Sequence, residues 1–440
     1  MPAGSEVRYP VQVVELGETH RAIRAIYRQE SARLIARLTR MLRDVGTAEE
    51  LAQDSLIAAL ESWPKSGVPD NPGAWLMQTA QRRALDELRR SRRQERRHDE
   101  FGQQLMARET DVPDLEAALD DEIGDDLLRL VFTACHPALS MEARVALTLR
   151  LFGGLTTEEI ARAFLLPEPT IAQRIVRAKR TLAEAKVPFE VPQRAELTER
   201  LGAVLEVVYL IFNEGYAASS GDAWTRPALC DEALRLARIL AELTPAEAEV
   251  HGLLALLEIQ NSRAATRTDA HGAPVALQDQ DRARWDALAI RRGLAALARA
   301  EALEGGDRPY ALQAAIAGCH AQAKSAEDTD WPQIAALYAA LARARPSPVV
   351  ELNRAVAVAM AQGPAAGLAV CDGLRQEPSL RAYALLPAVR GDLLYKLCRF
   401  EEAATELERA AALSRHAHEQ RGLLERAHAA RQAARHGSTN

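Results

Sequence analysis

The spacing of apolar residues predicts helices along most of the chain. Between residues 15 and 60, apolar side chains recur at intervals of three and four, which gathers them on one face of a helix. Residues 61–73 break this pattern with three prolines and two glycines, and a helix is expected to resume near Ala74 and to run to about Arg93. Helical periodicity returns in four short pieces over 127–185. The pattern therefore predicts an all-α fold.

Within the first stretch, one helix start has its own signal. Thr47 follows Gly46 and has Glu50 three residues further on, which is the arrangement of a capping box. We therefore expect a helix to begin at Thr47, with an inner face formed by the apolar residues that follow it.

The last 240 or so residues, from about 190 to 430, read as one Ala-, Leu- and Arg-rich helix after another, separated by breaks that contain Pro or Gly. Two stretches are loosely similar at a spacing of about 36 residues. In this alignment Ala355 corresponds to Gly391, and Gly367 corresponds to Ala403. A period in the mid-thirties with small residues at the expected helix crossings predicts a tetratricopeptide-like helical array.

Length and charge divide the chain further. A chain of 440 residues is too long for one core. The net charge of −6 hides a strong local contrast, because residues 98–126 hold eleven acidic residues and one arginine. We interpret this stretch as a linker. The expected domains are 15–97, the acidic linker 98–126, 127–186 and 190–430.

Several classes of protein are disfavoured by what the sequence lacks. Its five cysteines are far apart and form no CxxC pair, so we expect buried, reduced thiols in a cytoplasmic protein. It has no signal-peptide pattern at its start and no run of about 18 apolar residues, so we expect no membrane insertion. Phosphate-binding glycine loops, HExxH, GxSxG and metal-spaced Cys/His sets are missing. We expect no cofactor, no metal and no enzymatic activity.

The most specific motif is a pair of amphipathic helices between residues 155 and 182. Thr156 with Glu159 is a second capping box, and Ile160, Ala161 and Phe164 form the inner face of the first helix. A turn with two prolines follows, and Thr170 is expected to open the second helix. Its predicted inner face is Ile171, Ile175, Ala178 and Leu182, and its outward face is Gln173, Arg174, Arg177, Lys179 and Arg180. This is the arrangement of a helix-turn-helix that reads a DNA major groove. The alternative is an ordinary pair of amphipathic helices with arginine on the solvent-exposed face, which has the same pattern.

A second basic segment lies near the N-terminus. Residues 78–97 contain eight arginines and three acidic residues, which gives a local charge of +5 and an affinity for phosphates. The Pro- and Gly-rich loop before this segment, with Asn71, would be able to hold an extruded base. The alternative is a merely solvated helix end. We expect Trp75 and Leu76 to be core residues.

Together, these segments resemble the two conserved regions of extracytoplasmic-function sigma factors of the sigma-70 family. The match rests on Thr47 to Leu60, on Pro72-Gly-Ala-Trp75-Leu76, on Ala84 to Arg90 and on the helix-turn-helix, and it covers about residues 15–186. The resemblance implies RNA polymerase core and promoter DNA as partners. It departs from the usual pattern at Gln81-Arg82, where Arg-Asn is common, and at Ala172, where lysine is common.

The resemblance also assigns roles to individual residues. It implies polymerase docking by Glu49, Glu50, Gln53 and Asp54. It implies melting and reading of the −10 element by the loop 63–72 and the helix after it, with Asn71, Arg82, Arg83, Asp86, Arg89 and Arg90. It implies recognition of the −35 element by Thr170, Gln173, Arg174, Arg177, Lys179 and Arg180.

The C-terminal extension resembles that of the subgroup with a tetratricopeptide-like domain, on the stretches 208–216 and 346–355. Within the first stretch, Asn213, Glu214 and Gly215 read most simply as a helix end, the alternative being a ligand or polymerase contact. We expect the extension to be regulatory or to contact polymerase or another protein partner.

Two hypotheses concern regulation: the extension acts in cis, or the acidic linker shields the basic helices through Asp120, Asp121, Asp125 and Asp126. Two rival functions stay open, a helical-repeat adaptor and a one-component DNA-binding regulator that acts without polymerase.

Overall fold

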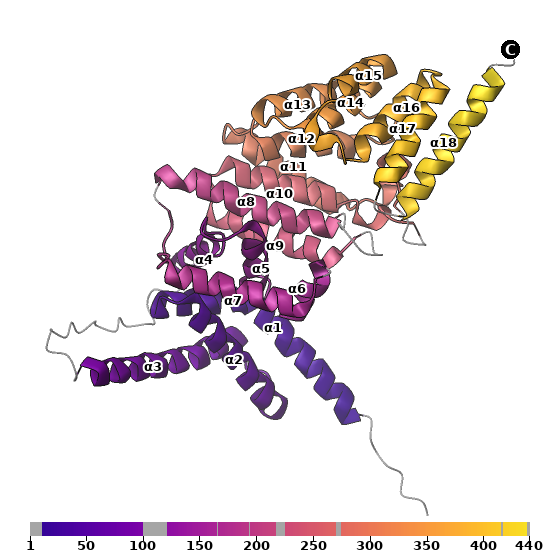
Figure 1. Ribbon diagram of the computed structural model, residues 1–440. Coiled ribbons are helices and arrows are strands. Elements are labelled where there is room, and N and C mark those ends of the chain that lie inside the picture. The colour runs from indigo at the N-terminus through magenta and orange to yellow at the C-terminus, as the bar shows by residue number, and fades with distance from the viewer. Residues whose placement is uncertain are drawn as a thin grey trace, which may run out of the picture. The chain divides into compact units, whose positions relative to one another are not determined.

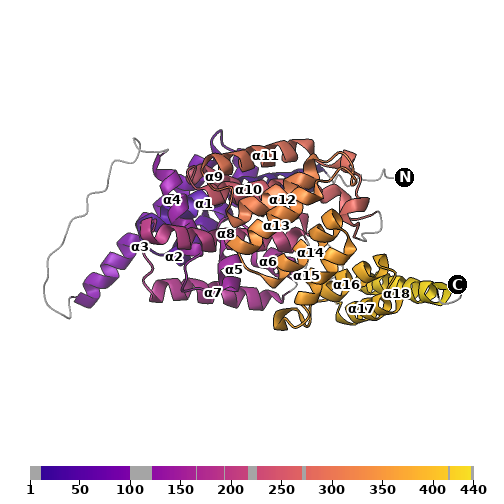
Figure 2. The same ribbon diagram turned by 90° about the horizontal axis from the view of Figure 1, so that it is seen from above.

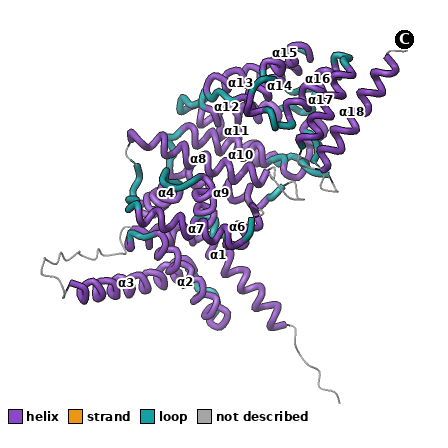
Figure 3. The backbone as a smooth tube through the Cα atoms, in the orientation of Figure 1, coloured by secondary structure: helices purple, strands orange, loops and turns teal. Residues whose placement is uncertain are grey.

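The computed structural model describes residues 11–99, 121–164, 166–192, 194–216, 225–269, 274–414 and 417–437. Over these ranges the backbone forms helices and no strand, which confirms the all-α prediction (Figure 3). The described residues group into two compact units, the first ending before residue 222 and also including residues 231–236. None of the helices described is long and apolar enough to cross a bilayer.

The first unit begins with three helices, α1 (Val11–Leu42), α2 (Val45–Ser66) and α3 (Pro72–Asp99), each of which packs against the other two (Figure 1). The expected start at Thr47 is wrong, because Asp44 is the cap and its carboxylate accepts a 2.6 Å hydrogen bond from the Thr47 N–H. The helix also continues through Pro64 to Ser66, further than the break predicted from residue 61.

Two tryptophans hold the end of α2 against the start of α3. Trp63 is fully buried, and its ring lies edge-on to Trp75, with centroids 5.2 Å apart. Leu76 is also fully buried, as predicted, while Trp75 is only partly covered. The second half of α3 extends beyond α1 and α2 (Figure 1).

Five more helices complete the first unit: α4 (Asp121–Ala134), α5 (Met141–Leu151), α6 (Thr157–Phe164), α7 (Glu168–Glu184) and α8 (Arg194–Tyr216). Helix α8 packs against α4 and α5, where Arg200 donates a 3.0 Å hydrogen bond to the Phe132 carbonyl. The first unit therefore includes a helix that the expected boundary near residue 190 assigned to the C-terminal domain.

The second unit is a stack of helices in which neighbours in sequence pack side by side (Figure 2). Its helices are the end of α9 (Pro227–Leu243), then α10 (Ala248–Asn261), α11 (Ala287–Ala302), α12 (Pro309–Gln322), α13 (Trp331–Ala344), α14 (Pro348–Gln362), α15 (Pro364–Gly373), α16 (Leu385–Lys396), α17 (Phe400–Leu413) and α18 (Ala417–Gly437). Short 3-10 turns stand at Ala264–Thr266, Leu277–Asp279, Arg282–Arg284 and Pro378–Leu380. This arrangement confirms the predicted helical array.

The 36-residue similarity corresponds to two successive helical hairpins, α14–α15 and α16–α17. A Cβ at Gly367 would lie 2.6 Å from the Ala355 carbonyl oxygen, and a Cβ at Gly391 would lie 3.2 Å from the Ala403 carbonyl oxygen. Because these positions correspond across the repeat, both hairpins cross at the same place through a residue without a side chain.

The cysteines differ in part from the expectation that all are buried. Cys135, Cys230 and Cys371 are buried, but Cys319 is half-buried and Cys398 is exposed. Burial raises the pKa of the Cys135 thiol to about 11, and burial does the same for Cys371.

Candidate nucleic-acid interface

The helix-turn-helix lies in the first unit and consists of α6 and α7. The backbone N–H of Thr156 donates to the Glu159 carboxylate at 2.8 Å, and the N–H of Glu159 donates to the Thr156 hydroxyl at 3.1 Å. The predicted capping box is therefore confirmed. Ile160 and Ala161 are buried against α7, as their spacing predicts.

Helix α7 starts earlier than the sequence suggests. Its cap is Pro167 and its first residue is Glu168, so Thr170 lies in the first turn, exposed, and does not open the helix. The predicted inner face is confirmed, with exposures of at most 5% for its four members, Ile171, Ile175, Ala178 and Leu182.

Four residues of the predicted outward face are accessible on α7. Gln173, Arg177 and Arg180 are exposed and Arg174 is partly so, and Arg180 also lies 3.4 Å from Glu184 one turn on. An amide and three guanidinium groups on one helix face are donors for base edges and phosphates. These donors are accessible without rearrangement of the helix.

Lys179 has a different environment from the rest of that face. Its ammonium group pairs with the carboxylate of Glu49 in α2, and its side chain is only 19% exposed. Glu49 is itself 3% exposed at its side chain, accepts a 2.6 Å bond from Arg150 Nε in α5, and is bonded by the amide of Gln53. A residue expected at polymerase and a residue expected at DNA thus bind each other.

The remaining acidic residues of α2 face outward. Glu50 is exposed, and Asp54 is half-exposed and forms a 3.0 Å ion pair with Arg83 of α3. This pair joins a residue expected at polymerase to one expected at the −10 element. Because both side chains are largely hydrated, the pair is worth at most about 1 kcal/mol and opens readily.

The basic face of α3 is accessible over the part whose side chains are described. Arg82 is exposed, Arg89 lies 3.4 Å from Asp86, and Arg90 lies 3.2 Å from Glu87, all on the helix surface. The side chains of the arginines at 92, 93, 96 and 97 lie outside the described residues. Asn71 is exposed, and its amide oxygen caps α3 by accepting from the Ala74 N–H at 3.0 Å.

Two further ionic contacts join α1 to the later helices, one at Asp126 and one at Glu159, and sequence reasoning missed both. Asp126 of α4 is 2% exposed and lies 3.3 Å from Arg40 and 2.8 Å from Arg129, with Arg37 at 3.9 Å. Burial was not expected for Asp126, which lies at the end of the predicted acidic linker 98–126. Of the other proposed shielding acids, Asp120 and the side chains of 121 and 125 lie outside the described residues.

The other missed pair is Arg28 of α1 with Glu159 of α6, 2.9 Å apart. Partial burial alone would raise the pKa of Glu159, but the Thr156 N–H and the Arg28 guanidinium outweigh it and hold the pKa below its usual value. Glu159 therefore both caps α6 and holds α1. No local pattern predicts this contact, because 131 residues separate its partners.

The chain matches three families in order along its length. Residues 26–94 match sigma-70 region 2, residues 129–182 match sigma-70 region 4, and residues 200–301 match a family of unknown function. No solved structure matches the chain. The part of the chain that the structure describes contains no cluster of His, Cys, Asp and Glu suited to a metal ion.

Among similar proteins, an uncharacterised protein of Rhizobium meliloti is 44% identical over 387 residues, which is 87% of this chain and 89% of that protein. The ECF RNA polymerase sigma factor SigK of Mycobacterium tuberculosis is 31% identical over 171 residues, 38% of this chain and 86% of that protein. SigK of Mycolicibacterium vanbaalenii is 31% identical over 184 residues, 39% of this chain and 89% of its own length. The matches to sigma-70 region 2 and region 4, together with the SigK relatives that this chain covers over more than four fifths of their length, show that the chain belongs to the extracytoplasmic-function sigma factors of the sigma-70 family.

Proposed function

We propose that this protein directs the RNA polymerase core to promoters and helps to melt the −10 element. The observation that carries the proposal is the exposed face of α7 with Gln173, Arg174 and Arg177, in a helix-turn-helix that matches region 4. The exposed arginines of α3, in the region 2 match, supply a second DNA-binding surface. The protein itself carries out no chemistry, which belongs to the polymerase.

The two surfaces act together because polymerase holds them at one spacing. Each alone offers only a few phosphate and base contacts, whereas two linked contacts bind as one bivalent interaction. In this mechanism Gln173 and Arg174, near the start of α7, read base edges, and Arg177 and Arg180 bind phosphates further along it. Arg82 and Arg89 bind the −10 strand while its bases leave the stack.

Reconstituted transcription tests this proposal. Purified protein and core polymerase are combined, promoters are located by footprinting, and run-off RNA is measured on those templates. Arg174→Ala with Arg177→Ala should abolish the −35 footprint and reduce run-off RNA by at least about tenfold, because base and phosphate contacts are lost together. Arg291→Ala, an exposed arginine in the second unit, is the matched control and should leave both unchanged.

The same experiment separates the rival functions. A one-component regulator would protect duplex DNA tightly without polymerase, and a helical-repeat adaptor would bind a partner but no core enzyme. Absence of core binding, or of RNA from any template, would exclude the proposed function. For the array, we propose contact with polymerase or a protein partner, which cross-linking from α13–α17 in the assembled holoenzyme would identify.

A further inference from the structure

Two arginines from outside the region 4 match bind the ends of its first two helices. Arg200 of α8 donates a 3.0 Å hydrogen bond to the carbonyl of Phe132, in the last turn of α4. Arg235 of α9 donates to the carbonyl of Phe152, the residue that ends α5. Both arginines lie in the segment that matches the family of unknown function, and both carbonyls lie in the segment that matches region 4.

The two carbonyls are groups for which their own helices supply no donor. The last carbonyls of an α-helix have no intrahelical N–H, and this end of the helix carries a partial negative charge, so a guanidinium group is favourable there. Phe132 and Phe152 are also buried, with exposures of 1% and 0%. The extension therefore supplies a cationic donor at the end of α4 and another at the end of α5.

Arg235 is held in place by a carboxylate on its own helix. Glu232, one turn earlier, accepts bonds from Arg235 Nη2 at 2.6 Å and from Arg235 Nε at 3.2 Å, and its side chain is only 10% exposed. A guanidinium group bound at two atoms in this way has a fixed direction. The turn after α5 comes close to the same residues, because a Cβ at Gly153 would lie 3.3 Å from the carboxyl carbon of Glu232. We name Glu232 and Arg235 the α9 pair.

The turn that the α9 pair contacts leads directly into the helix-turn-helix. Residues 152–156 separate α5 from α6, and within them the Leu155 N–H donates to the Leu149 carbonyl at 3.3 Å. Thr156 then forms the capping box of α6. Helix α4 packs against α5, and α7 packs against both α5 and α6. Because these connections are short, a shift of the end of α4 or α5 changes the direction in which α7 presents its exposed face.

We propose that Arg200 and Arg235 are positioning residues for −35 recognition, and that α8 and residues 231–236 of α9, which belong to the first unit, complete region 4. This inference rests on the proposed function and deepens it. The two arginines do not touch DNA; they fix the ends of α4 and α5, and these helices orient α7 towards the promoter. The beginning of the family of unknown function thereby has a part in reading the −35 element.

A comparison of promoters tests the proposal in the full-length protein. Glu232→Met with Arg235→Met removes the donor and leaves no unpaired charge, and urea unfolding first establishes that each variant is folded at the assay temperature. Run-off RNA is measured with saturating core polymerase on a footprinted promoter and on the same promoter with its −35 element replaced. The ratio of the two should fall at least about fivefold, as expected when one base contact is weakened. Core binding, and RNA from a template already melted at −10, should be unchanged.

Two further variants serve as control and rescue. Asp231→Met with Arg238→Met removes one acid and one arginine from exposed positions of the same helix, where Arg238 binds Glu258 of α10, and it should keep the wild-type ratio. Arg235→Lys keeps a cation and one donor for the Phe152 carbonyl, so it should restore most of the ratio. A merely structural role would lower RNA from every template together and leave the ratio unchanged, which would overturn the proposal.

Arg200→Met is an independent test at the end of α4. It keeps the side-chain stem beside the Phe132 ring, whose centroid lies 5.9 Å from the guanidinium carbon, and it removes the donor to the Phe132 carbonyl. The −35 ratio should fall in this variant as well, with core binding unchanged. An unchanged ratio in a folded variant would refute the role of the arginine that it lacks.

Hydrogen exchange in the free protein separates this inference from the proposed function. The N–H groups of Leu155 and Glu159, which bind the Leu149 carbonyl and the Thr156 hydroxyl, should exchange at least about tenfold faster when the α9 pair is replaced. If wild type starts no RNA from any template, the proposed function fails and the −35 role fails with it, while faster exchange still shows that the α9 pair holds the turn. If wild type prefers the intact promoter but neither ratio nor exchange changes in the variants, the function stands and this inference is refuted.

Discussion

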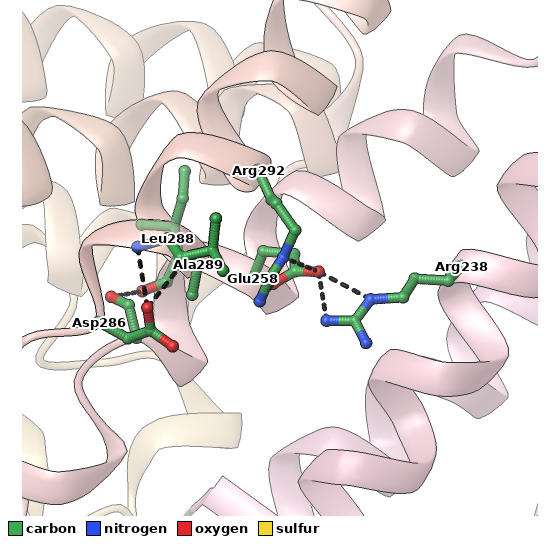
Figure 4. Close-up of polar contacts among 8 residues, drawn as sticks. Arg238, Glu258, Asp286, Leu288, Ala289 and Arg292 are labelled. Atoms are coloured by element: carbon green, nitrogen blue, oxygen red, sulfur yellow. Dashed lines mark hydrogen bonds and ion pairs between the residues drawn. The ribbon is translucent and has the colours of Figure 1, made fainter.

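Glu258 is the buried carboxylate that joins three helices of the second unit, so its removal measures how the array is held together. It lies in α10 with a side chain 3% exposed, and it accepts bonds from Arg238 of α9 at 2.6 and 2.9 Å and from Arg292 of α11 at 3.0 Å and 3.2 Å (Figure 4). All three residues lie within the segment that matches the family of unknown function. We predict that Glu258→Ala destabilises the second unit.

The magnitude follows from how much of each partner is hydrated. Breaking a fully buried ion pair costs about 3–5 kcal/mol, and an exposed pair is worth less than about 1 kcal/mol. The side chains of Arg238 and Arg292 are 46% and 42% exposed, so the energy of each ion pair with Glu258 lies between these two values. Glu258→Ala removes both ion pairs and leaves a small void, so we expect it to lower the free energy of unfolding by about 3 kcal/mol.

Urea unfolding followed by tryptophan fluorescence measures this cost, because Trp285 precedes Asp286, the residue that caps α11. Arg238→Ala alone should lower the free energy of unfolding by about 1 kcal/mol. The loss in the double variant Arg238→Ala/Glu258→Ala should be smaller than the sum of the two single losses by about 1 kcal/mol, because both single variants remove the same Arg238–Glu258 pair. Glu242→Ala, an exposed acid on α9, is the control. A change within about 0.5 kcal/mol of wild type for Glu258→Ala, or no coupling, would refute this account of the array.

Three further predictions concern titration and charge. Burial and two neighbouring guanidinium groups lower the pKa of His320 to about 4; because the unfolded value is about 6.5, stability should fall as pH drops from about 6.5 towards 4. At pH 5 this loss is roughly 2 kcal/mol, and His320→Gln should not show it in pH-dependent unfolding. In a thiol titration of the native protein, Cys398 should react first, and Cys135 and Cys371, with pKa values of about 11, should react only after denaturation. Finally, a plot of the logarithm of the binding constant of holoenzyme for promoter DNA against the logarithm of the salt concentration has a slope that reports phosphate contacts. Arg177→Ala should reduce the size of this slope by about one, as expected for loss of one phosphate contact.

Local features were predictable from sequence because neighbours along the chain decide them. The capping box of Thr156 and Glu159 and the buried face of α7 follow from spacing alone, and the structure confirms both. Two helix starts were predicted wrongly, since Asp44 competes with Thr47 for the same turn and Pro167 serves as cap in place of Thr170. In each case the cap lies three residues earlier than predicted.

Contacts distant in sequence were not predictable. Arg150 and Glu49 are 101 residues apart, and Arg28 and Glu159 are 131 residues apart, so no periodicity links them. The boundary expected near residue 190 has the same origin, because only packing shows that α8 contacts α4 and α5. A truncation at 190 would remove this helix and expose apolar side chains of the first unit.

The charged residues expected to bind polymerase and DNA differ in the free-energy cost of breaking the ion pairs that they already form. Asp54 and Arg83 are half-exposed and about two-fifths exposed, so water already shares their charges and a partner displaces this pair at little cost. Glu49 and Lys179 are largely dehydrated, and separating them is unfavourable unless a new cation meets Glu49 and a phosphate meets Lys179. In the proposed mechanism, only polymerase and promoter together supply both groups. DNA alone would leave Glu49 with one cation fewer, so duplex binding by the free protein should be weak until the core enzyme is present.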